Sequence, residues 1–292
     1  MAKKHERKEP ESKRAHMQSR FTRESLMGKH LYEEHMWTGS EIAVLPDVDL
    51  VFIGGRSIMD RGREAILQVV DEIIRCREQL GYRMILGVSG GVRNRHTWYQ
   101  GIDFGLPIGG LAMLAGAVEG QYARMLYALL AKHGGMWMAR EHFDKLPLYV
   151  YSDMIPISIA TPPYHFWEKP SRIGNIPEYG SDFGMYITAE LLGLRRLVFA
   201  KDVKGLYTKD PKKHPGKAEF IPRISAQELL EMDLDDLPVH RTVLYNMCRA
   251  HSAKELYLVN GLEKGNIEKA LAGENVGTVI YKDETGARQK AS

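Results

Sequence analysis

The sequence predicts an α/β domain with a mostly parallel central sheet that helices cover on both faces. Short apolar runs of strand length alternate along the chain with segments whose apolar residues recur at helical spacing. The runs are almost purely apolar, as strands buried in parallel sheets are. Two of them end in glycine pairs. Strands that alternate with helices in this way form a parallel sheet between helical layers.

In the first half of the domain, each predicted strand is an apolar run that a glycine pair closes. These runs are 48–53 and 83–88. Between them, the helical spacing of apolar residues predicts a helix over 58–80. A mostly apolar stretch predicts a long helix over 111–132, and the His-Gly-Gly that follows it is typical of a helix C-cap.

In the second half, capping residues mark the helices. A helix is predicted over 181–192, where Gly193 closes it. Ser225 and Glu228 have the spacing of a capping box that opens another helix. Gly273 closes a short helix over 267–272. The remaining predicted strands are 155–160, 197–200, 255–259 and 278–281.

Composition places the chain among ordinary globular proteins. It has 292 residues, of which 44% are hydrophobic. No apolar run reaches the roughly 18 residues of a membrane span, and no apolar segment follows the charged N-terminus as in a secretory signal. Cys76 and Cys248 lack metal-ligand spacing and are interpreted as reduced thiols. We therefore expect a cytoplasmic protein without a membrane partner.

The positive charge of the chain is concentrated in its first residues. The whole chain carries +3, but residues 1–23 alone carry +5, so the rest carries −2. Residues 1–42 are predicted to form a charged arm, 43–282 a nucleotide-binding domain and 283–292 a polar tail. The arm lacks the interleaved aromatic residues of a nucleic-acid surface, so a nucleic-acid partner is not expected.

The segment 197–211, LVFAKDVKGLYTKDP, is the first candidate site. It begins as a buried strand and ends at the turn signal Asp210-Pro211. Parallel sheets bind ligands at the carboxyl ends of their strands. There, Lys201 and Lys204 can meet a phosphate, Tyr207 offers a flat face to a base, and Gly205 allows a ligand close to the backbone. A lysine-rich surface turn has the same composition, so composition alone leaves both interpretations open.

The two glycine pairs are the second candidate site. Gly54 and Gly55 follow the first strand, and Gly90 and Gly91 follow the second, with Arg93 and Arg95 just beyond. Backbone amides at such turns bind anions, and an arginine fork matches two oxyanion oxygens. Ordinary strand-to-helix turns would look similar, but paired turns on neighbouring strands favour an anion site.

Residues 205–211 match the pattern G-[LIV]-Y-[TS]-x-[DN]-P, which resembles the nucleotide-binding segment of the amino acid kinase superfamily, in its uridylate kinase branch. Within this branch the chain resembles the molybdenum storage family from about Pro46 to Lys282. The matching segments are IGGRSIMDRG (53–62), GLP (105–107), PPY (162–164), KDVKGLYTKDP (201–211), FIPRIS (220–225) and VNGLEKGNIEKALAGENVGTVI (259–280).

The resemblance implies a fold and a set of ligands. It implies a three-layer αβα sandwich in which the glycine turns hold phosphates. It also implies that ATP and Mg²⁺ bind at residues 201–211, which include Asp202. An aspartate at the place of Asp182 lies near the phosphates in the resembling family, and this residue also suits the first turn or N-cap of the helix it opens.

The storage family further implies a cargo and an assembly. Its members hold molybdate or tungstate as polyoxometalate clusters in a cage, commonly a hexamer, which is here a homo-oligomer or contains a related second subunit. The helix over 111–130 is the candidate for subunit pairing. His165 follows the PPY motif, and His142, Glu119 and Gln121 are further candidate metal ligands. Solvated loop histidines remain the alternative for His165 and His142.

Two phenylalanines depart from the pattern of the resembling kinases. Those enzymes have a lysine at the end of the first strand, where this chain has Phe52, and another where it has Phe199. The storage subunits also keep the first lysine. Phosphoryl transfer needs such cations to neutralise charge on the transferring group. We therefore assign no catalytic residue and expect at most slow ATP hydrolysis. A uridylate kinase-like phosphotransferase and a nucleotide-binding regulatory subunit remain alternatives.

Overall fold

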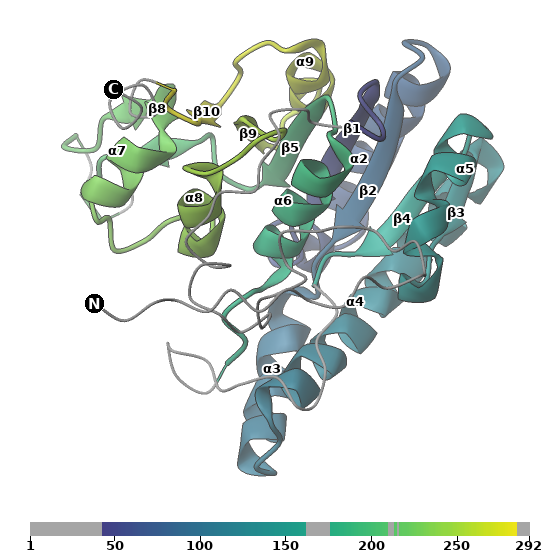
Figure 1. Cartoon of the computed structure of the whole chain (residues 1–292), viewed down its shortest axis with the longest axis horizontal. Coiled ribbons are helices and arrows are strands. Elements are labelled where there is room, and N and C mark those ends of the chain that lie inside the picture. Colours follow the sequence, from purple (N-terminus) through teal and green to yellow (C-terminus); the bar gives the residue numbers. More distant parts are fainter. Residues whose placement is uncertain (1–42, 162–175, 210–212, 215, 285–292) are drawn as a thin grey trace, which may run out of the picture. The chain divides into compact units, whose positions relative to one another are not determined.

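The computed structural model describes residues 43–161, 176–209, 213–214 and 216–284 (Figure 1). The predicted arm 1–42 and residues 285–292 of the predicted tail lie outside them. So do three of the candidate site residues. These are His165, Asp210 and Pro211.

The described residues contain an eight-stranded sheet in the order β3-β4-β2-β1-β5-β9-β10-β8. Every neighbouring pair in it is parallel except β9 and β10. The prediction of a mostly parallel sheet is therefore confirmed. A separate two-stranded antiparallel pair joins β6 to β7. The strands are β1 (Val48–Ile53), β2 (Arg83–Val88), β3 (Gly135–Trp137), β4 (Ile155–Ile159), β5 (Arg196–Lys201), β6 (Leu206–Tyr207), β7 (Phe220–Ile221), β8 (Arg223–Ser225), β9 (Glu255–Asn260) and β10 (Thr278–Tyr281).

Helices connect the strands and cover both faces of the sheet (Figure 1). The α-helices are α2 (Arg63–Glu78), α3 (Gly91–Asp103), α4 (Ile108–Leu130), α5 (Leu146–Tyr151), α6 (Ser181–Leu192), α7 (Ala226–Glu231), α8 (Arg241–Met247) and α9 (Asn266–Ala272). Three short 3₁₀ helices are η1 (Met59–Arg61), η2 (Ala131–His133) and η3 (Arg140–Lys145).

Two hydrophobic cores lie on the two faces of the sheet, which makes the domain a three-layer αβα sandwich. Alternate residues of β1 enter different cores, as a strand requires: Leu50 and Phe52 enter one, and Val51 and Ile53 enter the other. The first core is closed by side chains of α5, α6, α7 and α8. The second is closed by α2, α4 and α9. The predicted fold class is confirmed.

The structure also corrects several helix boundaries. The helix predicted over 58–80 is divided into η1 and α2, because Gly62 between them has φ +87°, outside the helical region. Helix α4 begins at Ile108, three residues before the predicted start, and ends at Leu130. The predicted capping box is present: Ser225 and Glu228 each accept a hydrogen bond from the backbone N–H of the other. Helices α3, α5 and α8 were not predicted.

The strand order places a topological switch point between β1 and β5. From β1 the chain continues to β2 on one side of the sheet, whereas β5 adjoins β1 on the other side and is followed by β9. Parallel sheets bind ligands at the carboxyl ends of strands at such a point. The turns after β1 and β5 are the two segments that the sequence selects as candidate sites.

Candidate functional site

A cavity of about 730 Å³ lies at the carboxyl ends of β1 and β5. Five segments form its walls: the turn after β1, the start of α3, residues 176–182 at the start of α6, the turn 201–209 after β5, and residues 236–240, which we call the wall segment. Of the predicted nucleotide-binding residues, those that line the cavity are Gly54, Gly91, Asp182, Lys201, Asp202, Gly205 and Tyr207.

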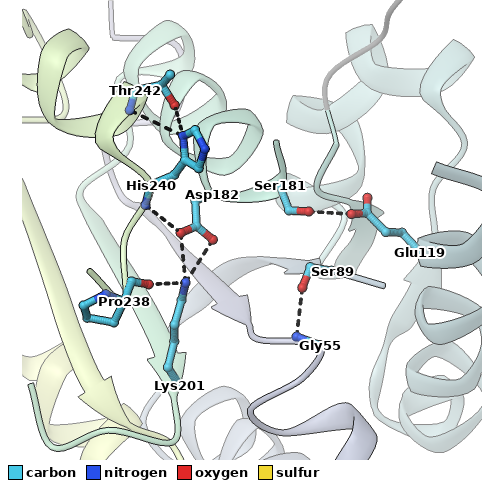
Figure 2. Close-up of polar contacts among 9 residues, drawn as sticks. All are labelled: Gly55, Ser89, Glu119, Ser181, Asp182, Lys201, Pro238, His240 and Thr242. Atoms are coloured by element: carbon cyan, nitrogen blue, oxygen red, sulfur yellow. Dashed lines mark hydrogen bonds and ion pairs between the residues drawn. The ribbon is translucent and has the colours of Figure 1, made fainter. Parts of the chain in front are cut away.

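The two glycine turns pack directly against each other. The N–H of Gly55 donates to Oγ of Ser89, at 2.8 Å (Figure 2). A Cβ at position 55 would collide with the backbone of Gly91 and of Ser89, so only glycine fits this contact. Gly54 is tied to the other neighbouring strand, because its N–H donates to the carbonyl of Ala200 at 3.0 Å. The paired turns predicted from the sequence therefore form one fixed floor under the cavity.

The Lys201 side chain is the centre of a polar cluster on the cavity wall (Figure 2). Its Nζ donates to both carboxylate oxygens of Asp182, at 3.0 and 2.9 Å, and to the carbonyl of Pro238, at 2.5 Å. Asp182 also accepts from the backbone N–H of His240 at 3.1 Å. Gly180 is the N-cap of α6, so Asp182 is a first-turn residue of this helix. Lys201 and Asp182 thus join β5, α6 and the wall segment.

Phe52 and Phe199 are core residues beneath this cluster. Their positions are paired between β1 and β5, and their rings meet edge to face with centroids 4.9 Å apart. Both side chains are almost completely buried, with exposed fractions of 1% and 0%. The ammonium of Lys201 lies 5.6 Å from each ring centroid, which is within cation–π range.

Glu119 is a fully buried carboxylate on α4 that connects four segments. It accepts from the N–H of Thr161 at 2.7 Å and from the hydroxyl of Thr161 at 2.8 Å. It also accepts from Oγ of Ser181 at 2.6 Å (Figure 2). It also accepts a longer bond, 3.3 Å, from Nδ2 of Asn94 on α3. Burial raises the pKa of Glu119, and its hydrogen bonds oppose that rise. Asn94 and Ser181 line the cavity, so Glu119 supports two of its walls from behind.

Of the other candidate metal ligands, the two that the structure describes do not gather around Glu119. Gln121 accepts from Arg93 at 2.7 Å on an exposed part of α4, and His142 is exposed in η3. No group of three His, Cys, Asp or Glu side chains suited to a metal ion occurs among the described residues. Metal binding by these side chains remains a prediction.

Arg93 is held away from the cavity. Its guanidinium lies 4.1 Å from the ring centroid of Tyr122, in addition to its bond to Gln121, and it does not line the cavity. Gly55 and Gly90 also do not line it. Gly55 lets the two turns pack closely, and Gly90 packs against Asn94.

Several residues of the cavity escaped the sequence analysis. Arg56 lines the cavity and directly follows the first glycine pair, which is a signal that sequence reasoning had available. The wall segment gave no signal, because no motif marks it and it reaches the cavity only through the fold. The lining residues absent from the predicted site are Arg56, Ser57, Asn94, Trp98, Ile176, Pro177, Gly180, Ser181, Asp236, Leu237, Pro238 and His240.

Comparison with known proteins places the chain in a family. The model of the Amino acid kinase family matches residues 162–253. The molybdenum storage protein subunit beta of Azotobacter vinelandii is 39% identical over 241 residues, which are 82% of this chain and 88% of that protein. The chain belongs to the molybdenum storage protein subunit family. A uridylate kinase of Fervidobacterium nodosum is 32% identical to this chain over 104 residues, which are 36% of this chain and 42% of that enzyme.

Two solved structures share the fold of this chain. Uridylate kinase from Archaeoglobus fulgidus has a TM-score of 0.63 and 21% identity, and covers 80% of this chain and 99% of its own. UMP kinase from Bacillus anthracis also has a TM-score of 0.63, with 16% identity, and the match covers 82% of this chain and 97% of that chain. Identities this low support the shared fold only. Among the described residues, no helix has the length and apolarity to cross a membrane.

Proposed function

We propose that this chain is a subunit that stores molybdenum or tungsten. It would hold molybdate or tungstate as polyoxometalate clusters inside an oligomeric cage in the cytoplasm. The observation that carries the proposal is the 39% identity to a molybdenum storage subunit over 82% of the chain. The match also extends over 88% of that storage subunit, so it is not confined to the nucleotide-binding segment.

We further propose that the cavity binds ATP with Mg²⁺. Five lysine and arginine side chains and three aspartates line it. Two of the aspartates are already neutralised, Asp182 by Lys201 and Asp202 by Arg61. The remaining positive charge suits a polyanion such as a triphosphate. Tyr207 lines the same cavity and offers a ring face to a base.

The buried phenylalanines support storage over rapid phosphoryl transfer. Phe52 and Phe199 supply no charge, and Lys201 has its donors engaged by Asp182 and Pro238. A missing cation at the transferring phosphoryl group costs on the order of 10²–10³ in rate. We therefore expect ATP turnover to be slow.

Elemental analysis tests the storage function. The chain is purified from cells grown with molybdate, and separately with tungstate, and the metal bound per chain is measured. We expect several metal atoms per chain after gel filtration. Metal at no more than trace stoichiometry in both preparations would exclude storage by this chain.

The main alternative is a uridylate kinase-like phosphotransferase. It is favoured by the fixed glycine turns and by the position of Asp182 on the cavity wall. A coupled assay with ATP and UMP separates the two functions, because turnover in the ordinary enzyme range of about 1–10³ s⁻¹ would support the kinase. A regulatory subunit would bind nucleotide but would neither turn over ATP nor retain bound metal.

A further inference from the structure

We propose that Arg56 directly binds the anion in the cavity, whereas Lys201 is a positioning residue that holds the cavity wall. This rests on the proposed function, since it names the residue that contacts the ligand of that site. The ligand is a tetrahedral oxyanion, either a phosphoryl group of a nucleotide or molybdate or tungstate. The two roles reverse what the sequence suggests, because the sequence analysis assigned phosphate contact to Lys201 and no role to Arg56.

Lys201 has little capacity left for a ligand. An ammonium has three N–H donors, and here Nζ faces three acceptor atoms: both oxygens of Asp182 and the carbonyl of Pro238. The Asp182 carboxylate also neutralises its charge at 2.9 Å. The side chains of both residues are only about 15% exposed, 15% for Lys201 and 16% for Asp182, so water screens this pair weakly. An incoming anion would have to displace a carboxylate that is already well placed.

The contacts of Lys201 instead fix the wall segment. Lys201 holds the carbonyl of Pro238, and its partner Asp182 holds the N–H of His240. Four residues of this segment line the cavity: Asp236, Leu237, Pro238 and His240. Loss of the ammonium would leave the Pro238 carbonyl without this donor and Asp182 without its cation. We therefore expect the wall to loosen and the affinity for any ligand to fall indirectly.

Arg56 has the opposite properties. Its side chain lines the cavity and is exposed, and it makes no hydrogen bond or ion pair with any of the described residues. Its backbone is nevertheless held in place, because Gly54 is bonded to β5 and Gly55 to Ser89 in the second glycine turn. A guanidinium offers a planar set of donors that matches two oxygens of a tetrahedral anion. A free fork on a fixed turn at the switch point is suited to direct contact.

Two of the neighbouring cations are already engaged by other groups. Arg61 lies nearby in the chain, but its guanidinium is bound to Asp202 and to the carbonyl of Ser57. The ammonium of Lys204 lies 5.0 Å from the ring centroid of Phe220. Charge is therefore available at Arg56 without first breaking an interaction among the described residues.

Calorimetric titration of the full chain with Mg-ATP, and separately with sodium molybdate, tests the assignment at two salt concentrations. Arg56→Gln should weaken binding about tenfold or more, as expected for a hydrogen bond to a charged group. It should also reduce the salt dependence of the affinity, because a direct charge contact is lost. Lys201→Gln should weaken binding as well, but with the salt dependence of the wild type. Arg249→Gln, at an exposed arginine that does not line the cavity, is the matched control.

The outcomes separate this assignment from the proposed function. A wild-type chain that binds neither anion overturns both. A wild type that binds, with Arg56→Gln unchanged, overturns only the role of Arg56. If Lys201→Gln reduces the salt dependence as Arg56→Gln should, then Lys201 contacts the anion directly. Where Lys201→Gln folds poorly in a thermal melt, Lys201→Arg tests the same contact and should leave the salt dependence unchanged.

Discussion

At the scale of single residues, Glu119 shows how a buried charge supports a cavity that it does not enter. Its carboxylate receives donors from Thr161, Ser181 and Asn94. We predict that Glu119→Ala lowers the free energy of unfolding by at least about 3 kcal/mol, because several buried donors lose their acceptor. Urea denaturation measures this loss, and a loss below about 1 kcal/mol would contradict the supporting role.

Glu119→Gln should cost much less, within about 1 kcal/mol. The amide oxygen can keep the bond from the N–H of Thr161, and the hydroxyls of Thr161 and Ser181 can rotate to accept from the amide nitrogen. Oδ1 of Asn94 is buried and has no hydrogen-bond partner among the described residues, so a flipped Asn94 can accept as well. The same denaturation experiment compares this variant with Glu119→Ala.

The raised pKa of Glu119 gives a pH dependence with a definite sign. Burial raises the pKa above its ordinary value of 4.5, so the folded state binds the proton more tightly than the unfolded state. The stability from this carboxyl is complete below 4.5 and is lost as the pH rises through the folded pKa. Unfolding free energies measured from pH 4 upward should therefore fall more steeply for the wild type than for Glu119→Gln. Parallel curves would show that the folded pKa is not raised.

Phe52 provides a second test at this scale. The ring is 1% exposed and packs against Phe199, with the Lys201 ammonium above both. A lysine here would bury a second ammonium beside the first, and Asp182 already pairs with Lys201. We predict that Phe52→Lys lowers the unfolding free energy by on the order of 3 kcal/mol without tightening Mg-ATP binding. A thermal melt beside a titration checks both, and tighter binding would show that a cation at this position still clamps phosphate.

At the scale of elements, the contact between the two glycine turns depends on the missing side chain of Gly55. A Cβ there would meet backbone atoms of Gly91 and Ser89, which cannot rotate away as a side chain would. We predict that Gly55→Ala costs about 3 kcal/mol of stability and widens the floor of the cavity. Gly180→Ala is the control, because a Cβ there would meet nothing within 4 Å. Equal stability of the two variants would mean that the turns separate easily.

The sequence predicted the elements that its own pattern encodes. Apolar runs located β1, β2 and β5 to within a residue or two, and the capping box located the start of α7. Helix α3 escaped prediction because its sequence is polar, with Arg, Asn, His and Gln among its residues and few apolar repeats. Lys201 and Asp182 were recognised singly, but their pairing depends on how α6 packs against β5. The wall segment joins them through backbone groups, which a sequence pattern does not reveal.

At the scale of the whole molecule, helix α4 is the element that points to assembly. Its inner side packs on the sheet through residues such as Ala123 and Leu126. Outward, it leaves Met125 and Leu129 exposed by 48% and 40%. These two residues are four apart and lie on one face of the helix. Large apolar side chains exposed together on a helix are typical of a subunit interface.

The last prediction is that this face of α4 holds subunits together. Light scattering on the chain expressed alone should give a mass several times the 33.1 kDa of one chain. The double variant Met125→Glu with Leu129→Glu should lower that mass, because like charges would be buried at the interface. The separated subunits of this variant should still unfold cooperatively in a thermal melt. Leu191→Glu, at an α6 residue exposed by 67%, is the control and should keep the full mass. A wild-type monomer would remove the cage from the proposed function, and an unchanged mass of the double variant would move the interface away from this face.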